Sequence, residues 1–253
     1  MHDIDAIKVR AATKLICGGD WPDWQLTKAA SVLIDVKSTS RHTPWPMLTI
    51  CTAFLGVQMT NLLSVDWSKI PAPSDDGAAK HLIGKPVPPI SLRSTDGRSI
   101  DLASLQGTTV VYAYPMTGQP DVPLPDGWDM LPGARGCTPQ SCAFRDHFAE
   151  LRALGAENLF GLSTQTTDYQ KEAAERLHLP FALLSDSNFK LAEALRLPTF
   201  ETAGMRLFKR LTMVISQQRI EHVFYPVFPP DRSATDVVDW LKARISASPI
   251  EVS

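Results

Sequence analysis

The chain has 253 residues, 44% of them hydrophobic and 21% charged, which suits one domain of ordinary size with an additional segment. Its formal net charge is −2 and it has no long block of lysine and arginine, so composition argues against a nucleic-acid-binding protein. The four cysteines are too few for a disulfide-stabilised scaffold, so we expect a reducing compartment, the cytoplasm.

Residues 1–69 show neither a helical nor a strand period and no motif, and we interpret them as an N-terminal extension of unknown role, for which partial disorder is one alternative. The stretch 46–65 is uncharged, so a membrane anchor is a minority alternative to the cytoplasmic prediction, although Gln58 and Asn61 interrupt it. We predict that the folded domain comprises residues 70–253.

The first part of this domain has clear turn and strand signals. Residues 70–90 have the proline and glycine density of a linker. Apolar and polar residues then alternate around Asp96-Gly97, which predicts a hairpin, and residues 108–115 predict a buried strand. A proline-rich loop of about twenty residues follows, and loops of that length inside compact domains are usually functional.

A helix is predicted from Cys137 onward, because Phe144, Phe148 and Leu151 share one face and Gly155 stands just past the end. Strands and helices then alternate. We expect a strand at 158–165, a helix at 168–179, a strand at 181–186, a helix at 188–197, a hairpin at 210–225 turning near Gln217-Gln218, and a closing helix at 233–245 with Ser233 as N-cap. This order indicates an α/β or α+β fold with a central sheet.

Two of the four cysteines, Cys137 and Cys142, stand five positions apart where the first helix begins. On one helix this spacing gives about 7.5 Å of rise and roughly 140° of rotation, too far for a disulfide unless the helix unwinds. A zinc site is disfavoured because no second Cys or His pair has usable spacing. A pair of buried, inert cysteines stays an open alternative.

The position of Cys137 favours a reactive thiol. A sulfur in the first turn of a helix faces unpaired N–H groups and the positive end of the helix dipole, which favour the thiolate. Cys142 lies a turn and a half further on. We therefore expect sequential chemistry, in which Cys137 is oxidised, the helix start unfolds and Cys142 captures the sulfenic acid as a disulfide.

The segment GCTPQSCAFRD, residues 136–146, closely resembles the GCTxxxCxFRD segment of bacterioferritin-comigratory-protein/PrxQ-type peroxiredoxins, in the alkyl-hydroperoxide-reductase/thiol-specific-antioxidant family. The resemblance covers about residues 82–246. It implies a thioredoxin-like fold with peroxiredoxin elaborations, a central mixed sheet flanked by helices. It also implies reduction of hydroperoxides by a thioredoxin-like dithiol without a metal or organic cofactor, in a monomer or weak dimer.

The resemblance also assigns roles to residues. It makes Cys137 the peroxidatic cysteine and Cys142 the resolving one, and it places Arg210 beside the reactive sulfur. A guanidinium there would hold the thiolate and polarise the peroxide as charge moves onto the leaving oxygen. Arg206 is the reserve candidate for this position.

One part of the family pattern is broken. Peroxiredoxins usually carry a Pro and a Thr seven and three residues before the reactive cysteine, where this chain has Met130 and Ala134. We hypothesise that the long loop is an insertion and that Pro115 and Thr117 are the displaced pair, with the Thr117 hydroxyl orienting the peroxide. Thr117 as an ordinary turn residue is the alternative.

Other residues receive structural interpretations. Trp128 is interpreted as an anchor of the loop on the core, with a cover over the site as the alternative. His147 and His222 are expected on a solvated helix face and an exposed hairpin, since a thiolate needs no dedicated base to cleave a peroxide. Cys17 and Cys51 lie outside the matching region and receive no role.

The leading function is therefore a thiol-dependent peroxidase. One alternative is a thioredoxin-type disulfide oxidoreductase, although that chemistry usually uses CxxC and this chain has CTPQSC at 137–142. Another is a redox-sensing or copper-handling module, in which Arg210 would have no purpose beside a cation.

Overall fold

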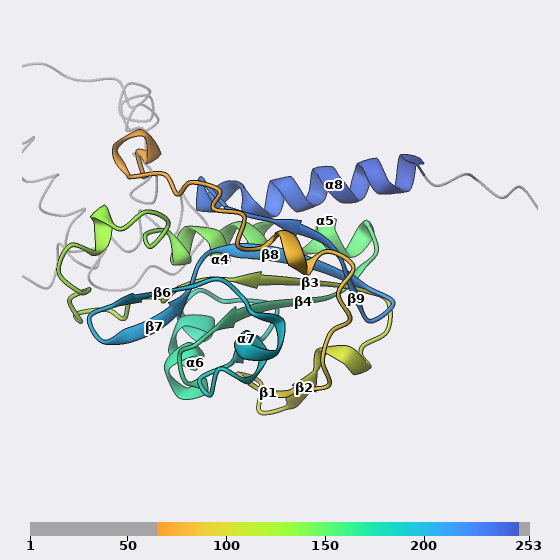
Figure 1. Ribbon diagram of the computed structural model, residues 1–253, viewed down its shortest axis with the longest axis horizontal. Helices are drawn as coiled ribbons and strands as arrows, with labels where there is room; N and C mark the ends of the chain where they lie inside the picture. The colour runs from red at the N-terminus through yellow and green to blue at the C-terminus, as the bar shows by residue number, and fades with distance from the viewer. Residues whose placement is uncertain (1–64, 248–253) are drawn as a thin grey trace, which may run out of the picture. The chain divides into compact units, whose positions relative to one another are not determined.

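The structure, a computed structural model, describes residues 65–247. The strands are β1 (Ser91–Ser94), β2 (Ser99–Asp101), β3 (Thr108–Ala113), β4 (Ala156–Ser163), β5 (Leu183–Ser185), β6 (Thr199–Thr202), β7 (Met205–Phe208), β8 (Leu211–Ser216) and β9 (Arg219–Phe224). Within the described residues, seven of them form one mixed sheet in the order β2-β1-β5-β4-β3-β8-β9 (Figure 1). The three central strands β5, β4 and β3 are parallel, while the outer strands join antiparallel.

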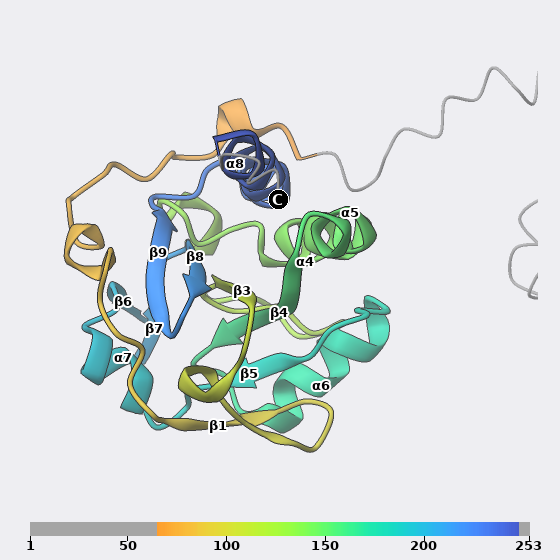
Figure 2. The ribbon, with the colours of Figure 1, turned by 90° about the vertical axis from the view of Figure 1, so that its right-hand side faces the viewer.

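Helices cover both faces of this sheet. The α-helices are α4 (Cys137–Asp146), α5 (Phe148–Ala153), α6 (Thr167–Arg176), α7 (Lys190–Leu195) and α8 (Ser233–Ala247). Short 3-10 helices are η1 (Trp67–Lys69), η2 (Lys80–Leu82), η3 (Leu102–Ser104), η4 (Trp128–Met130) and η5 (Pro230–Arg232). Figure 2 shows α4, α5 and α8 side by side on one face, with α7 on the other.

Alternation along the central strand β3 divides the core into two clusters. Val110 and Tyr112 point into the cluster that also holds residues of α4, α5 and α8. Val111 and Ala113 belong to the cluster on the opposite face. Phe144 of α4 stacks on Tyr112, with ring centroids 4.4 Å apart, so the helix that begins at the cysteine is fixed against the central strand.

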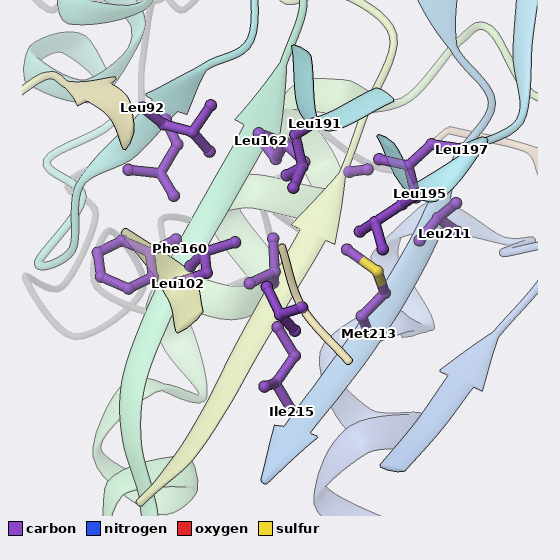
Figure 3. Close-up of a cluster of buried hydrophobic side chains, with 14 of the residues drawn as sticks. Leu92, Leu102, Phe160, Leu162, Leu191, Leu195, Leu197, Leu211, Met213 and Ile215 are labelled. Atoms are coloured by element: carbon purple, nitrogen blue, oxygen red, sulfur yellow. The ribbon is translucent and has the colours of Figure 1, made fainter. Parts of the chain in front are cut away.

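The opposite cluster joins the sheet to α7 and the early part of the chain (Figure 3). Its side chains are almost fully buried, which makes this face a closed core. The residues drawn and labelled are Leu92, Leu102, Phe160, Leu162, Leu191, Leu195, Leu197, Leu211, Met213 and Ile215.

Both predicted hairpins are confirmed. β1 and β2 pair antiparallel around Asp96-Gly97. β8 and β9 pair around Gln217 and Gln218, whose φ values of 49° and 63° are those of the two-residue turn that matches strand twist. A third hairpin, β6 with β7, was not predicted, because its turn carries the weaker signal Ala203-Gly204.

The predicted continuous helix after Cys137 is wrong at one residue. It breaks at His147, whose backbone leaves the helical conformation (φ −92°, ψ 4°) and separates α4 from α5. The apolar period continues across the break, since Phe144 and Leu151 are both fully buried. Spacing alone therefore could not reveal it.

The predicted N-cap at Ser233 is also wrong. Ser233 is already the first residue of α8, because η5 leads directly into the helix. Its hydroxyl group bonds to Gln140 and Thr212 instead of a helix N–H. This serine therefore ties α8 to the neighbourhood of the cysteine.

The interpretation of residues 70–90 as a linker is wrong, because this segment packs against the domain. Ala79, Leu82 and Val87 are buried in the cluster of the α7 face. The prediction of an anchor at 46–65 lies outside the described residues except at Val65, as does the N-terminal extension up to residue 64. The domain boundary at 69/70 stays a prediction. Among residues 65–247, no helix has the length and apolar character needed to cross a membrane.

Candidate active site

Cys137 is the first residue of α4, at the end of the proline-rich loop. Gly136 before it adopts a left-handed conformation (φ 106°), which turns the chain from the loop into the helix. The sulfur is buried, with 4% of the residue exposed, and its thiol donates to the carbonyl of Ala134 at 3.7 Å. The helix start thus presents this side chain inward.

Arg210 stands directly before β8 and reaches the same point from the sheet. Its Nη2 lies 3.3 Å from the Cys137 sulfur. The same nitrogen also lies 3.2–3.3 Å from the carbonyl oxygens of Gly133, Ala134 and Arg135. A single buried guanidinium therefore contacts both the sulfur and the backbone that leads to it.

Gln140 holds Arg210 in this position. Its Oε1 accepts from Arg210 Nη1 at 2.5 Å, and its Nε2 donates to the Ser233 hydroxyl at 3.2 Å, which in turn bonds Thr212 at 3.0 Å. Sequence reasoning missed this residue. The available signal was its spacing, since a residue three positions after Cys137 lies on the same face of the helix.

Two positively polarised groups, the Arg210 guanidinium and the first turn of α4, meet at the sulfur of Cys137. The guanidinium is permanently charged, and the first-turn N–H groups of α4 carry the positive end of the helix dipole. Because both lie in a water-poor environment, their interaction with an anion is stronger than in bulk water. The arrangement suits a nucleophilic thiolate.

Cys142 has a different environment. It is half-buried, and both it and Cys137 are free thiols in the structure. Burial raises the pKa of the Cys142 thiol, and the nearby Arg145 counteracts this only in part. Since both cysteines belong to α4, the two sulfurs can bond only after the start of the helix unwinds.

Thr117 is buried beyond the end of β3. Its hydroxyl donates to Gln165 Oε1 at 3.2 Å, and its carbonyl accepts from the Tyr169 hydroxyl at 3.0 Å. Burial raises the pKa of Tyr169, and Cys137 makes a minor contribution in the same direction. The two hydrogen bonds tie Thr117 to Gln165 and to Tyr169 of α6.

The two positions that depart from the family pattern are occupied differently. The Met130 side chain is exposed at 67%. Ala134 is fully buried, and its carbonyl oxygen accepts from the sulfur and from Arg210. The residue three positions before the cysteine thus reaches the site through its backbone.

The remaining predicted residues contact other parts of the fold. Trp128 is confirmed as an anchor, buried with Ala134 and Leu207 of β7. The reserve arginine, Arg206, lies over the Phe189 ring at 4.8 Å. Its guanidinium also reaches Glu193, 3.6 Å away.

The two histidines are likewise engaged elsewhere. His147 bonds Glu150 at 3.0 Å. His222 is half-buried, not exposed as predicted, because its ring stacks on Trp240 with centroids 5.0 Å apart. Burial lowers the pKa of His222.

Replacing Gly136 with alanine should disrupt the site. The new Cβ would stand 2.6 Å from Pro230 Cγ and 2.8 Å from the Trp67 ring, in a conformation that L side chains rarely adopt. We expect a loss of about 2 kcal/mol or more in the free energy of unfolding, measured by urea denaturation. Gly97→Ala has a similar φ of 83° but meets no atom within 4 Å, so it isolates the conformational cost. Equal losses in the two variants would contradict this packing role.

Known proteins resemble this chain in sequence. The Redoxin family model matches residues 82–238. Peroxiredoxin Q, chloroplastic, from Oryza sativa subsp. japonica is 29% identical over 211 residues, covering 79% of this chain and 89% of that protein. Peroxiredoxin Bcp from Escherichia coli is 31% identical over 169 residues, covering 63% and 94%.

Solved structures show the same likeness. Peroxidoxin BcpB from Mycobacterium tuberculosis has a TM-score of 0.52 at 25% identity, covering 64% of this chain and 96% of that one. PrxQ from Xylella fastidiosa has a TM-score of 0.52 at 20% identity with the same coverage, which is a likeness of fold alone. The predicted thioredoxin-like fold, a mixed sheet flanked by helices, is thereby confirmed.

Proposed function

This chain belongs to the redoxin family, and we propose that it reduces hydroperoxides as a thiol-dependent peroxidase with Cys137 as its peroxidatic cysteine. The observation that carries the assignment of residues is the 3.3 Å contact between Arg210 Nη2 and the Cys137 sulfur at the start of α4. The alternative functions, a thioredoxin-type oxidoreductase and a redox-sensing or copper-handling module, are not favoured, since the named relatives are peroxiredoxins.

The first step is attack of the Cys137 thiolate on one oxygen of the hydroperoxide. A sulfur–oxygen bond forms as the oxygen–oxygen bond breaks, and the leaving oxygen takes up a proton and departs as water or an alcohol. The sulfur is oxidised to sulfenic acid and the peroxide is reduced. Arg210 stabilises the negative charge that grows on the leaving oxygen, because its guanidinium is already in place when the charge develops.

The second step joins the two cysteines. The Cys142 sulfur attacks the Cys137 sulfenic acid, the sulfur–sulfur bond forms, and the hydroxyl group leaves as water with the proton that Cys142 gives up. The start of α4 must unwind for this step. An external dithiol of the thioredoxin type then reduces the disulfide and is itself oxidised, which returns both cysteines to the thiol state.

We propose a monomer or a weak dimer in the cytoplasm as the working state. The support for the cytoplasm is compositional, since four cysteines are too few for a disulfide-stabilised scaffold. The support for the assembly state is the resemblance to PrxQ-type peroxiredoxins. Sedimentation velocity across a concentration series checks the assembly, and fractionation of the source cells checks the compartment.

The function is tested by following NADPH oxidation with thioredoxin, thioredoxin reductase and either hydrogen peroxide or an organic hydroperoxide. We expect turnover that depends on both the protein and the peroxide. Replacing thioredoxin with glutathione tests the class of reductant. If no dithiol supported turnover in protein whose Cys137 and Cys142 thiols are both reduced at the start, the peroxidase function would be ruled out.

We propose Thr117 as the residue that stands in for the missing threonine, supported by its burial beside the Tyr169 hydroxyl. Thr117→Val keeps the shape and removes the hydroxyl. If that hydroxyl orients the peroxide, kcat/KM for hydrogen peroxide should fall about tenfold or more. Gln165→Leu, which keeps the Thr117 hydroxyl but removes the bonds from Gln165 to the Thr117 hydroxyl and backbone, is the companion variant that reports the effect of Thr117 position. Unchanged turnover in Thr117→Val would leave Thr117 with a structural role alone.

A further inference from the structure

A strap formed by residues 66–76 lies across the start of α4. It precedes residues 82–238, which the Redoxin family model matches. In Figure 2 this segment, drawn in orange, begins beside α8 and continues around the edge of the domain. It touches the fold at both of its ends.

Trp67 forms the first contact. Its ring lies against Gly136, since a Cβ there would stand 2.8 Å from the ring. Its Nε1 donates to Asp231 of η5 at 2.7 Å, and its ring meets Phe228 edge to face at 5.9 Å. The indole therefore connects the residue before the reactive cysteine to the segment that leads into α8.

Asp76 forms the second contact. Its carboxylate accepts from Lys209 Nζ at 2.6 Å and from the Tyr225 hydroxyl at 2.7 Å. These bonds hold the pKa of Asp76 well below its usual range. Between the two ends, Pro73 packs on Gly133, whose carbonyl accepts from Arg210. The strap thus rests on the same backbone that Arg210 binds.

These contacts matter because the reaction needs two conformations of one helix. Attack on the peroxide uses the folded start of α4, where Arg210 meets the sulfur. Disulfide formation requires that start to unwind, because Cys137 and Cys142 are separated by about 7.5 Å of helical rise. Any group that binds only the folded start slows the second step relative to the first.

We propose that the strap is a clasp on the folded start of α4, and that Trp67 is a positioning residue that limits the rate at which oxidised Cys137 reaches Cys142. This inference rests on the proposed function. Its consequence is chemical: while the clasp is closed, a second hydroperoxide can oxidise the sulfenic acid to sulfinic acid, with release of water or an alcohol. The clasp therefore sets how readily excess peroxide inactivates the protein.

The test uses the full chain with Cys17 and Cys51 replaced by serine, so that only the two reactive thiols are counted. Trp67→Ala should speed disulfide formation after a pulse of hydrogen peroxide by about tenfold, because the folded start of α4 loses the indole that lies against Gly136 and that Asp231 holds in place. The fraction of protein that gains two oxygen atoms at high peroxide, measured by intact mass, should fall correspondingly. The rate of the first oxidation should change by less than about twofold, because Arg210 is untouched.

A pair of reagents separates clasp opening from general damage. In a Cys142→Ser background, the buried Cys137 should react with a bulky aromatic disulfide about tenfold faster when Trp67 is alanine, but with the small hydrogen peroxide molecule at an unchanged rate. Asp231→Ala removes the indole's partner and should show the same effect more weakly, whereas Trp67→Phe should be intermediate. Ser68→Ala, whose hydroxyl bonds only the neighbouring Asp66, is the matched control.

The outcomes are distinguishable. Unchanged disulfide and labelling rates in both Trp67→Ala and Asp231→Ala, with normal peroxide consumption, would overturn the clasp and leave the peroxidase intact. If both Cys137→Ser and Cys142→Ser kept full catalytic turnover of peroxide, the peroxidase itself would be overturned. If Trp67→Ala melts below the assay temperature, the rates of disulfide formation and thiol labelling in Asp231→Ala and Trp67→Phe test the clasp instead.

Discussion

Replacing Cys137 with serine is expected to abolish peroxide reduction, with kcat/KM falling by at least roughly 10⁴-fold, because a serine hydroxyl is not ionised at neutral pH and attacks peroxides poorly. The measurement is stopped-flow consumption of hydrogen peroxide by reduced protein, followed by NADPH-coupled turnover. Since serine is close to cysteine in size, the buried position should still be filled and the melting temperature should change little.

Cys142→Ser is the matched control for this prediction. It should consume one equivalent of peroxide at the normal rate and then stop, leaving a sulfenic acid on Cys137 that a dimedone-type reagent traps. A Cys137→Ser variant that continues to consume peroxide, or a Cys142→Ser variant that never starts, would reverse the assigned roles.

Arg210→Lys should lower kcat/KM for hydrogen peroxide by about 10²-fold to 10³-fold, which is the usual effect of removing one preorganised donor from a developing anion. Lysine keeps the positive charge but loses the planar fork that bonds Gln140, the loop carbonyls and the sulfur together. The effect should appear in the first oxidation step, observed in single-turnover stopped flow, while the disulfide step is spared.

Arg206→Lys provides the control, since Arg206 is also an arginine of the same region but contacts Phe189 and Glu193. Its kcat/KM should stay within about twofold of the parent value. Thermal unfolding of both variants distinguishes lost chemistry from lost structure. An equal decrease in the two variants, or no decrease in Arg210→Lys, would contradict the placement of the guanidinium in the reaction.

The central features of the fold could be predicted because their signals are local. The strand at β3, the hairpins and the helix at Cys137 each depend on residues within a few positions of one another. The break at His147 could not, since the apolar face continues through it. The β6–β7 hairpin was missed because its turn, Ala203-Gly204, carries a weaker signal than Asp96-Gly97.

The candidate site divides in the same way. Cys137 was indicated by its position at a helix start and by its motif, and Arg210 by resemblance at a strand start. The support around them is long-range. The role of Gln140 as a support for Arg210 depends on its hydrogen bond to Ser233, which lies 93 positions away in the sequence.

The strap is the clearest example of what sequence reasoning could not provide. Trp67 lies 164 positions from its partner Asp231, near the end of residues 1–69, which had no interpretable pattern. A tryptophan beside a proline-rich stretch gives no periodic signal, and its contact with Gly136 depends on the exact path of both loops. Only the assembled fold brings these residues together.

The most direct test of Cys137 as the peroxidatic cysteine is to treat the reduced protein with one equivalent of hydrogen peroxide, block the remaining thiols, and map the products by peptide mass spectrometry under non-reducing conditions. We predict a single new bond joining Cys137 to Cys142, and oxidation confined to Cys137 when Cys142 is serine. Oxygen or a disulfide found first on any other cysteine, with Cys137 still a free thiol, would contradict it.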